Sequence, residues 1–328
     1  MDVCRIIAHH RDAYRIATPS GERNAVLAGK LRHHTSRQAD LPAVGDFVYA
    51  RLPDGLGPAV IESVLPRRTV FMRRAAGDRP DDQVIAANID VVFVMLGLDH
   101  DFNVRRVERY LAAVWESGAT PVVLLNKSDL CDDVHAKADE LRAVAIGVDA
   151  HVLSALNADG IDAIHSYLTT GVTVGVVGSS GVGKSTLLNR LLEREAQPTR
   201  EVREHDSRGR HTTTHRELFT LQNGASVIDT PGMREFRLSD DAAGVESVFA
   251  DIEALATQCR FADCAHGVEP GCAVRDGIDA ERLAADHKLL TEVRYEEMRG
   301  DGSAARERER PGRIGAKALR QMYREGKR

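Results

Sequence analysis

The sequence is poor in aromatic residues and in long apolar runs. Aromatic residues make up 5% of its 328 positions, and there is a single tryptophan. The longest apolar run, Val91–Leu98, is well short of the ~20 residues that a membrane-spanning helix needs. The first residues also lack the apolar segment that is typical of a secretory signal. These absences lead us to expect a cytoplasmic protein with no membrane partner.

An excess of basic residues is also missing, because the net charge of the whole chain is −5. This excludes a protein that binds nucleic acid over its entire surface. The charge is uneven, however, because residues 299–328 carry ten basic and four acidic side chains. Shorter basic patches lie within residues 5–37 and 67–79. Each patch can contact a polyanion or form an ordinary solvated face, and we favour the second interpretation for any single patch.

Residues 1–75 predict an all-β domain. Short alternating runs are separated there by turn residues such as Pro19, Ser20 and Gly21. The expected strands are Val3–Ala8, Tyr14–Thr18, Ala25–Leu31, Asp46–Arg51 and Ala59–Val64. Five short strands favour an OB-fold barrel, a class that often binds oligonucleotides. A purely structural role is the alternative, because a fold alone is weak evidence of function.

Residues 76–238 predict a central α/β domain. A linker rich in Arg and Asp over residues 66–88 spans its beginning, and apolar runs then alternate with segments of helical periodicity. The expected strands are Ile89–Leu98, Thr120–Leu125, Ala150–Leu153, Val172–Val177, Arg216–Leu221 and Ala225–Ile228. The expected helices are Val104–Ser117, Val134–Ile146, Ile161–Leu168 and one that follows the loop ending at Thr186. This alternation is typical of a doubly wound parallel sheet with helices on both faces.

Residues 239–328 predict a mostly helical domain with a basic C-terminal tail. Helical periodicity covers Gly244–Gln258 and Ala280–Arg299, and three cysteines and a histidine lie between these two segments. Three thiols and one imidazole make a closed tetrahedral ligand set, which suits one structural Zn²⁺. Buried free cysteines or a disulfide are the alternatives. The predicted zinc ligands are Cys259, Cys264, His266 and Cys272.

A phosphate-binding loop is predicted after the strand Val172–Val177, where residues 178–185 match G-x-x-x-x-G-K-[ST]. Glycines let backbone N–H groups turn toward a phosphate, and the positive end of the next helix faces the same anion. Lys184 can reach the β- and γ-phosphates, and the Ser185 hydroxyl can bind Mg²⁺. An accidental match is the alternative. The predicted phosphate-binding residues are Gly178, Ser179, Ser180, Gly181, Val182, Gly183, Lys184, Ser185 and Thr186.

Two shorter motifs predict that the bound base is guanine. Residues 126–129 read N-K-S-D, and the Asp129 carboxylate can accept hydrogen bonds from two guanine N–H groups that adenine cannot supply together. Lys127 can pack over the base, and residues 154–155, S-A, fit a backbone contact to guanine O6. Helix-capping turns are the alternative for both motifs. The predicted base-binding residues are Asn126, Lys127, Ser128, Asp129, Ser154 and Ala155.

The magnesium side of the site is predicted from residues 229–232, D-T-P-G, which follow the last expected strand. The Asp229 carboxylate can hold Mg²⁺, and the Gly232 N–H can sense the γ-phosphate. A Pro-Gly turn without this role is the alternative. Upstream, Thr213 is the expected switch hydroxyl, with Thr214 close behind. The predicted magnesium ligands are Ser185, Thr213 and Asp229.

These motifs occur in an unusual order. A Ras-like GTPase begins with the phosphate loop, whereas here N-K-S-D and S-A come first, so we predict a circularly permuted GTPase domain. The D-T-P-G turn then leads directly into the C-terminal domain. We hypothesise that loss of the γ-phosphate moves that domain as a lever.

The residue that orients the hydrolytic water is not the usual one. Ras-like enzymes have a glutamine after D-x-x-G, but Met233 stands there and cannot hydrogen-bond a water usefully. Either hydrolysis is weak or another group substitutes. His211 can accept a proton near pH 7, and Arg208 or Arg210 can stabilise transition-state charge. A solvated loop without a catalytic role is the alternative for all three residues.

Together these stretches resemble the ribosome small-subunit-dependent GTPase A (RsgA) family of bacteria. The resemblance covers essentially the whole chain. It rests on the barrel, Q-V-I-A-A-N-I-D at 83–90, the nucleotide motifs, G-R-H-T-T-T at 209–214, and C-R-F-x-D-C-x-H-x-x-E-P-G-C-A-V at 259–274.

The resemblance implies a late maturation factor of the small ribosomal subunit. It implies slow GTP hydrolysis that the subunit stimulates, with release coupled to hydrolysis. It also implies that the barrel and the zinc domain contact ribosomal RNA, and that His211 replaces the missing glutamine. The alternatives are an RNA binder that senses nucleotide with negligible hydrolysis and a regulatory GTPase that acts on a protein partner. A monomer is the expected state.

Overall fold

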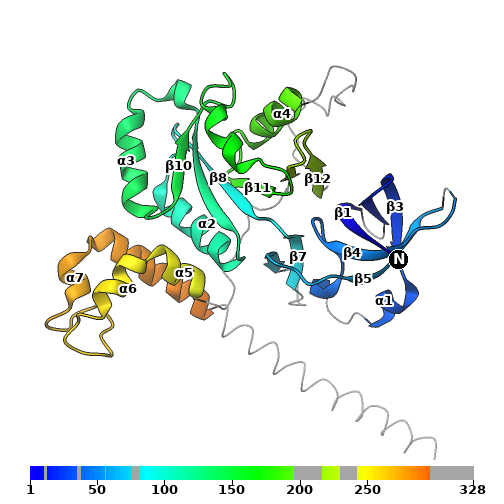
Figure 1. The fold of residues 1–328 in the computed structure, drawn as a ribbon. Coiled ribbons are helices and arrows are strands. Elements are labelled where there is room, and N and C mark those ends of the chain that lie inside the picture. The colour runs from blue at the N-terminus through cyan, green and yellow to red at the C-terminus, as the bar shows by residue number, and fades with distance from the viewer. Residues whose placement is uncertain are drawn as a thin grey trace, which may run out of the picture.

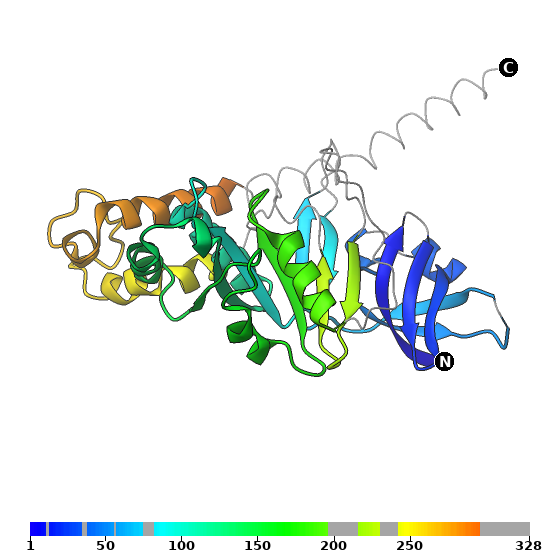
Figure 2. The ribbon, with the colours of Figure 1, turned by 90° about the horizontal axis from the view of Figure 1, so that it is seen from above.

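The computed structural model describes residues 1–10, 13–34, 38–55, 57–74, 82–195, 216–229 and 242–295. These residues form a β-barrel, a central α/β domain and a group of C-terminal helices, which lie in a row with the α/β domain in the middle (Figure 2). Within these ranges, no helix has the length and apolar character needed to cross a bilayer.

The barrel closes because β1 pairs with both β2 and β4, while β5 pairs with both β3 and β4. Inward side chains such as Ile6, Ile16 and Ile61 are fully buried, as the alternating pattern predicts. The strands are β1 (Asp2–His10), β2 (Ala13–Thr18), β3 (Gly21–Leu27), β4 (Phe47–Arg51) and β5 (Ala59–Val64).

The third strand was predicted four residues too late. Gly21 has a φ of +118° and pairs with Thr18, so the turn is tight and β3 begins directly after it. The end of the predicted strand lies instead in the short helix α1 (Gly29–His34), which precedes the 3₁₀ turn η1 (Gln38–Asp40).

The predicted linker over residues 66–88 was wrong in part, because it contains a separate antiparallel sheet of β6 (Val70–Arg74) and β7 (Asp82–Ala87). Phe71 and Ile85 are both 1% exposed and join a core that includes Val44. The many charged residues of this segment favoured a linker, but the few apolar residues of the segment are buried in a core that other parts of the chain also form.

The central sheet has the order β10-β9-β8-β11-β13 in its parallel part. The strand β12 pairs antiparallel with β13, so the expectation of a wholly parallel sheet was wrong at this edge. A short turn over residues 221–225 joins these two strands, and so short a connection allows only antiparallel pairing. The strands are β8 (Val91–Gly97), β9 (Thr120–Asn126), β10 (Asp149–Val152), β11 (Thr173–Gly178), β12 (Arg216–Thr220) and β13 (Ser226–Asp229).

Helices cover both faces of this sheet, as predicted. Along β8, Val94 and Leu96 join the core beneath α2 (Val104–Glu116) and α3 (Val134–Val144). Phe93 and Met95 point the other way, to α4 (Lys184–Glu195) and the 3₁₀ helix η3 (Ile161–Tyr167). Alternation along the strands therefore builds two separate cores.

The neighbouring strands β8 and β11 lead into helices on opposite faces, α2 and α4. Such a reversal of winding leaves a crevice at the carboxyl ends of the two strands, where ligands bind in open α/β sheets. The phosphate loop follows β11 and therefore lies at this crevice.

The C-terminal helices pack beside α2, on the side away from the barrel (Figure 1). They are α5 (Ala243–Val248), α6 (Ala250–Ala256), α7 (Ala273–Gly277) and a helix over residues 280–295. The predicted helix Gly244–Gln258 is broken at Phe249, the residue between α5 and α6. The Phe249 side chain is fully buried. The short helix α7 was not predicted.

One continuous sheet joins the barrel to the central domain. Residues 8 and 9 of β1 pair antiparallel with residues 216 and 217 of β12, so eleven strands run from β10 to β4 without a break. The first strand of the chain is thus hydrogen-bonded to a strand that lies more than 200 residues later.

Candidate functional site

The phosphate loop has the backbone that its glycines predict. Gly178 has a φ of +145° and Gly183 a φ of +103°, both of which favour glycine. Lys184 is the first residue of α4, and its Nζ donates to the carbonyl oxygens of Gly178 at 2.8 Å and Ser179 at 2.6 Å. The ammonium group is therefore folded back over the loop, at the positive end of the helix.

Asn126 connects the base motif to the phosphate loop. It is 3% exposed, its Nδ2 donates to the Val182 carbonyl at 2.7 Å, and its Oδ1 accepts from the Ala155 N–H at 2.8 Å. A Cβ at position 183 would lie 2.3 Å from Asn126 Nδ2, so this close approach requires Gly183. Three predicted motifs that are far apart in the sequence thus meet at one buried amide.

The Asp129 carboxylate is oriented by Ser154, whose Oγ donates to Asp129 Oδ1 at 2.5 Å. Asp129 is exposed, so its carboxylate is accessible to a ligand. Ser128 and Asp129 lie in the short 3₁₀ turn η2 (Ser128–Leu130), next to the left-handed Lys127. This arrangement can present a fixed carboxylate to two N–H groups of a planar base.

Sequence reasoning missed two acidic residues at this site. Asp99 Oδ2 accepts from Lys127 Nζ at 2.6 Å, and Asp101 accepts from the Ser179 hydroxyl and from Arg106 at 2.7 Å. Both lie in the loop between β8 and α2, at the switch point of the sheet. Their position directly after a buried parallel strand is the signal that could have found them.

Both carboxyl groups have pKa values below the usual range. Burial acts to raise the pKa of Asp99, but hydrogen bonds from Lys127 and from the Asp101 N–H outweigh it. Hydrogen bonds from Arg106 and then Ser179 lower the pKa of Asp101. Both side chains are therefore ionised at neutral pH.

The magnesium side of the site is described only in part. Ser185 lies in the first turn of α4 and is exposed, and Thr186 follows it. The backbone of Asp229 ends β13, which pairs with the phosphate-loop strand β11. The Asp229 side chain and the predicted residues Arg208, Arg210, His211, Thr213, Thr214, Gly232 and Met233 lie outside what the structure describes.

The predicted ligand cluster comes together between α6 and α7, with Cys272 at the N-cap of α7. The donor atoms of Cys259, Cys264, His266 and Cys272 all lie within 4.8 Å of one another. His266 Nδ1 is 3.7 Å from Cys259 Sγ and 3.5 Å from Cys272 Sγ, and these two sulfur atoms are 4.0 Å apart. The four side chains can therefore hold one metal ion.

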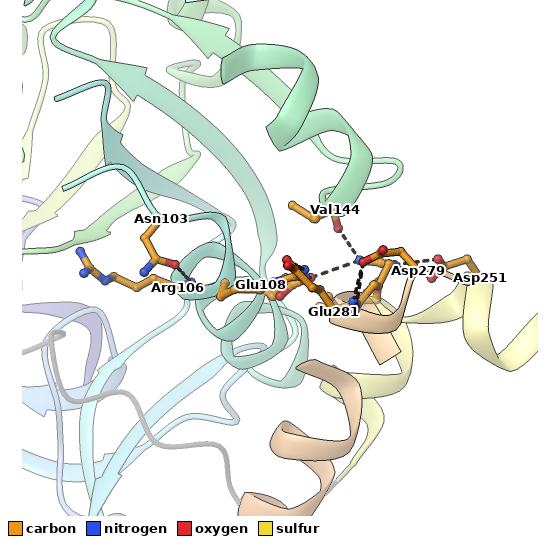
Figure 3. A network of polar contacts seen from close by, with 10 residues as sticks. Asn103, Arg106, Glu108, Val144, Asp251, Asp279 and Glu281 are labelled. Carbon is orange, nitrogen blue, oxygen red and sulfur yellow. Dashed lines mark hydrogen bonds and ion pairs between the residues drawn. The ribbon is translucent and has the colours of Figure 1, made fainter. Parts of the chain in front are cut away.

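A buried charge network fastens the C-terminal helices to α2, and we name it the Arg282 network (Figure 3). Arg282 is paired twice with Asp251 of α6, at 2.7 Å, and with Glu108 of α2 at 3.2 Å. It also donates to the carbonyl oxygens of Val144 and Val248. One guanidinium group therefore links α2, α3, α5 and α6.

Comparisons with known proteins agree with this architecture. A sequence model of the RsgA GTPase family matches residues 64–239. A protein of Lactiplantibacillus plantarum named small ribosomal subunit biogenesis GTPase RsgA 2 is 47% identical over 297 residues, which cover 89% of this chain and 83% of that protein. A protein of Opitutus terrae named small ribosomal subunit biogenesis GTPase RsgA is 48% identical, over 93% and 88% of the two chains.

A solved structure has the same fold. The crystal structure of YjeQ from Thermotoga maritima superposes with a TM-score of 0.67 at 26% identity, and the match covers 89% of this chain and 98% of that one. The identities above, over most of each chain, and the matched family model point to one conclusion. The chain belongs to the RsgA GTPase family and is a circularly permuted GTPase with an N-terminal barrel and a C-terminal Cys₃His cluster.

Proposed function

We propose that this GTPase binds the small ribosomal subunit and its RNA, and hydrolyses GTP to GDP and phosphate during maturation of that subunit. Support comes from the names of relatives that are 47–48% identical over 89–93% of this chain. We further propose that the protein works in the cytoplasm as a monomer, and that subunit-stimulated hydrolysis releases it.

The observation that carries the nucleotide assignment is the contact of Asn126 with both Val182 and Ala155, because it holds the base motif and the phosphate loop together. In this proposal Asp129 selects guanine and Lys127 packs over the base. The S-A backbone contacts O6, while the phosphate loop and Lys184 bind the phosphates.

The roles in the hydrolytic step are proposed from the chemistry of the residue types. Mg²⁺, when bound, would supply positive charge to the β- and γ-phosphates, and its protein ligands would be Ser185, Thr213 and Asp229. Lys184 neutralises charge that develops on the leaving phosphate. His211 positions the attacking water, since Met233 cannot, and Gly232 senses the γ-phosphate.

We propose that the Cys₃His cluster holds a structural Zn²⁺. Zn–S bonds of about 2.3 Å and Zn–N bonds of about 2.0 Å in a tetrahedron place two sulfur atoms about 3.8 Å apart, and sulfur and nitrogen about 3.5 Å apart. The observed separations among Cys259, His266 and Cys272, 4.0, 3.7 and 3.5 Å, are close to these values, and the donor atom of Cys264 lies within 4.8 Å of the others. Four protein donors leave no open position for catalysis.

We divide the chain into a barrel (1–75), a GTPase domain (76–238) and a zinc-binding domain (239–328). The β6–β7 sheet spans the first of these borders, so the two sides of residue 75 are tied by backbone hydrogen bonds. This division is a proposal about autonomous folding, which expression of the separate segments tests.

The test is phosphate release from GTP measured alone, with purified small ribosomal subunits, and with large subunits as control. We expect strong stimulation by small subunits only, and loss of that stimulation in His211→Ala. Equal slow rates in all three reactions would contradict the proposal and favour an RNA binder that only senses nucleotide. Stimulation that survives in His211→Ala would remove only His211 from the mechanism.

A further inference from the structure

The loop between β8 and α2, residues 98–103, belongs to none of the nucleotide motifs, yet it contacts two of them. It follows β8 at the switch point of the sheet, between the base motif after β9 and the phosphate loop after β11. Its backbone is anchored there, because the Leu98 N–H donates to the Asn126 carbonyl at 2.8 Å. Lys137 of α3 donates to the Leu98 carbonyl at 3.0 Å.

Asp99 holds the side chain of Lys127. The carboxylate is 12% exposed and the lysine side chain 26% exposed, and their 2.6 Å contact is therefore partly shielded from solvent. The second oxygen of Asp99 accepts from the Asp101 N–H at 3.1 Å, which fixes the carboxylate itself. Lys127 also has a φ of +67°, which few residues with a side chain adopt, and the contact with Asp99 holds its side chain in one arrangement.

Asp101 holds the phosphate loop from the same side. It accepts from the hydroxyl of Ser179, the second residue of that loop, and from Arg106 of α2 at 2.7 Å. Asn103 caps the helix by accepting from the Arg106 N–H at 3.1 Å, so Asp101 stands on a fixed helix end.

We propose that Asp99 and Asp101 are positioning residues for the guanine nucleotide, Asp99 through Lys127 at the base and Asp101 through Ser179 at the phosphates. The proposal rests on the proposed function only in taking Lys127 and the phosphate loop as nucleotide-binding groups. A flexible lysine loses rotamer freedom when it packs on a base, and a partner that already holds it removes that cost from binding.

The proposed role of Asp99 predicts a particular pattern of nucleotide affinity. Lys127 would meet the part of the nucleotide that GDP and GTP share, so Asp99→Asn should weaken both equally. The KM for GTP should then rise while kcat stays unchanged, as expected for loss of uniform binding. We expect a rise of about threefold to tenfold in Kd, the size of the cost of ordering one flexible side chain on binding.

The experiment is a double-mutant cycle on the full-length protein, with fluorescent N-methylanthraniloyl GDP as the probe. Asp99→Asn should raise Kd in the wild-type background and change nothing in Lys127→Met, because the partner ammonium is already gone. Asp101→Asn should raise Kd in both backgrounds and change nothing in Ser179→Ala. Asp139→Asn, which removes an equally short but exposed pair with Arg142, is the matched control and should leave Kd unchanged.

The outcomes separate this proposal from the assignment on which it rests. A Kd for Asp99→Asn within twofold of wild type would overturn the role of Asp99, and additivity with Lys127→Met would show that it does not act through that lysine. A wild-type protein that binds adenine and guanine nucleotides equally would instead contradict the proposed function. Circular dichroism of each variant shows whether it is folded, and Asp101→Asn gives an independent test if Asp99→Asn is not.

Discussion

The central domain is joined to its two neighbours in physically different ways. Toward the barrel the joint contains backbone strand pairing, because β1 pairs with β12 and extends one sheet across both domains, and the Arg5 side chain of β1 adds a hydrogen bond to Thr173 of β11 at 2.7 Å. Toward the C-terminal helices the joint is helix packing: α5 and α2 share an apolar core and approach closely at Gly244, and the Arg282 network adds a buried charge contact with Glu108. Strand pairing tolerates changes of side chain, whereas helix packing depends on the side chains that are buried between the helices.

The comparison also bears on the lever hypothesis. The C-terminal helices share a core with α2, and Arg282 ties them to it by buried charge. A lever that moves them against α2 must break that network, at a high cost. The structure therefore favours a C-terminal module that moves together with α2 as one body.

The largest effect is expected from Arg282→Ala. Removing the guanidinium leaves Asp251 and Glu108 without their shared partner in a site where Arg282 is 8% exposed. We expect the free energy of unfolding to fall by about 3–5 kcal/mol, measured by urea denaturation. Arg142→Ala, at an exposed pair, should cost less than about 0.5 kcal/mol. A similar small loss for Arg282→Ala would refute the contrast between the joints.

A steric change at the same joint should cost less. A Cβ at position 244 would lie 2.2 Å from the Ala112 carbonyl oxygen, so Gly244→Ala must push α5 away from α2. We expect a loss of about 2 kcal/mol, although alanine is normally the better helix residue. A variant as stable as wild type in the same denaturation assay would mean that the two helices separate freely.

Glu108→Gln should behave differently from Arg282→Ala, because Arg282 keeps its two contacts with Asp251. Burial raises the pKa of Glu108 above about 4.5, against the opposing effect of Arg105 and Arg282. An acid with a raised folded-state pKa contributes stability at low pH that is lost as the pH rises through that pKa.

We therefore expect Glu108→Gln to stay within about 1 kcal/mol of wild type at pH 7. Its stability relative to wild type should improve as the pH rises above about 4.5. Urea midpoints of both proteins at several values between pH 4.5 and 8 provide the check. A relative stability that worsens with rising pH would show that ionised Glu108 is net stabilising.

The smallest effect is expected at the barrel joint. Arg15 of β2 and Glu217 of β12 form an ion pair over Ala8 of the β1 strand between them, but their side chains are 38% and 34% exposed. Arg15→Gln should lower the free energy of unfolding by less than about 0.5 kcal/mol, because the backbone pairing remains. Thermal unfolding followed by circular dichroism measures this, and a loss comparable to that of Arg282→Ala would remove the distinction between the two joints.

The nucleotide motifs could be predicted because each is local and has a fixed spacing, and the structure brings Asn126, Ser154 and the phosphate loop together as expected. Asp99 and Asp101 match no local motif, because they contact Lys127 and Ser179, which follow other strands of the sheet. The Arg282 network has no local pattern at all, since Arg282 and Glu108 are 174 residues apart.

The errors in the predicted fold have similar causes. The strands β6 and β7 were missed because charged residues dominate a segment whose few apolar side chains enter a core formed elsewhere. The antiparallel β12 was misassigned because a strand's direction depends on its connection rather than on its composition. Elements with a strong local pattern, such as the helical periodicity of α2 and the apolar run of β9, were predicted to within a residue.

The pairing of β1 with β12 also has a consequence for synthesis of the chain. The barrel strands are complete once residue 64 has been made, but the edge of β1 at residues 8–9 finds its partner only at residues 216–217. At 5–20 residues per second, the ribosome needs about 8–30 s to make the intervening segment. During that interval the edge of β1 lacks this partner, and an unpaired strand edge is a site for unwanted pairing with other chains. A barrel that folds before β12 emerges would therefore expose this edge to aggregation until β12 pairs with it.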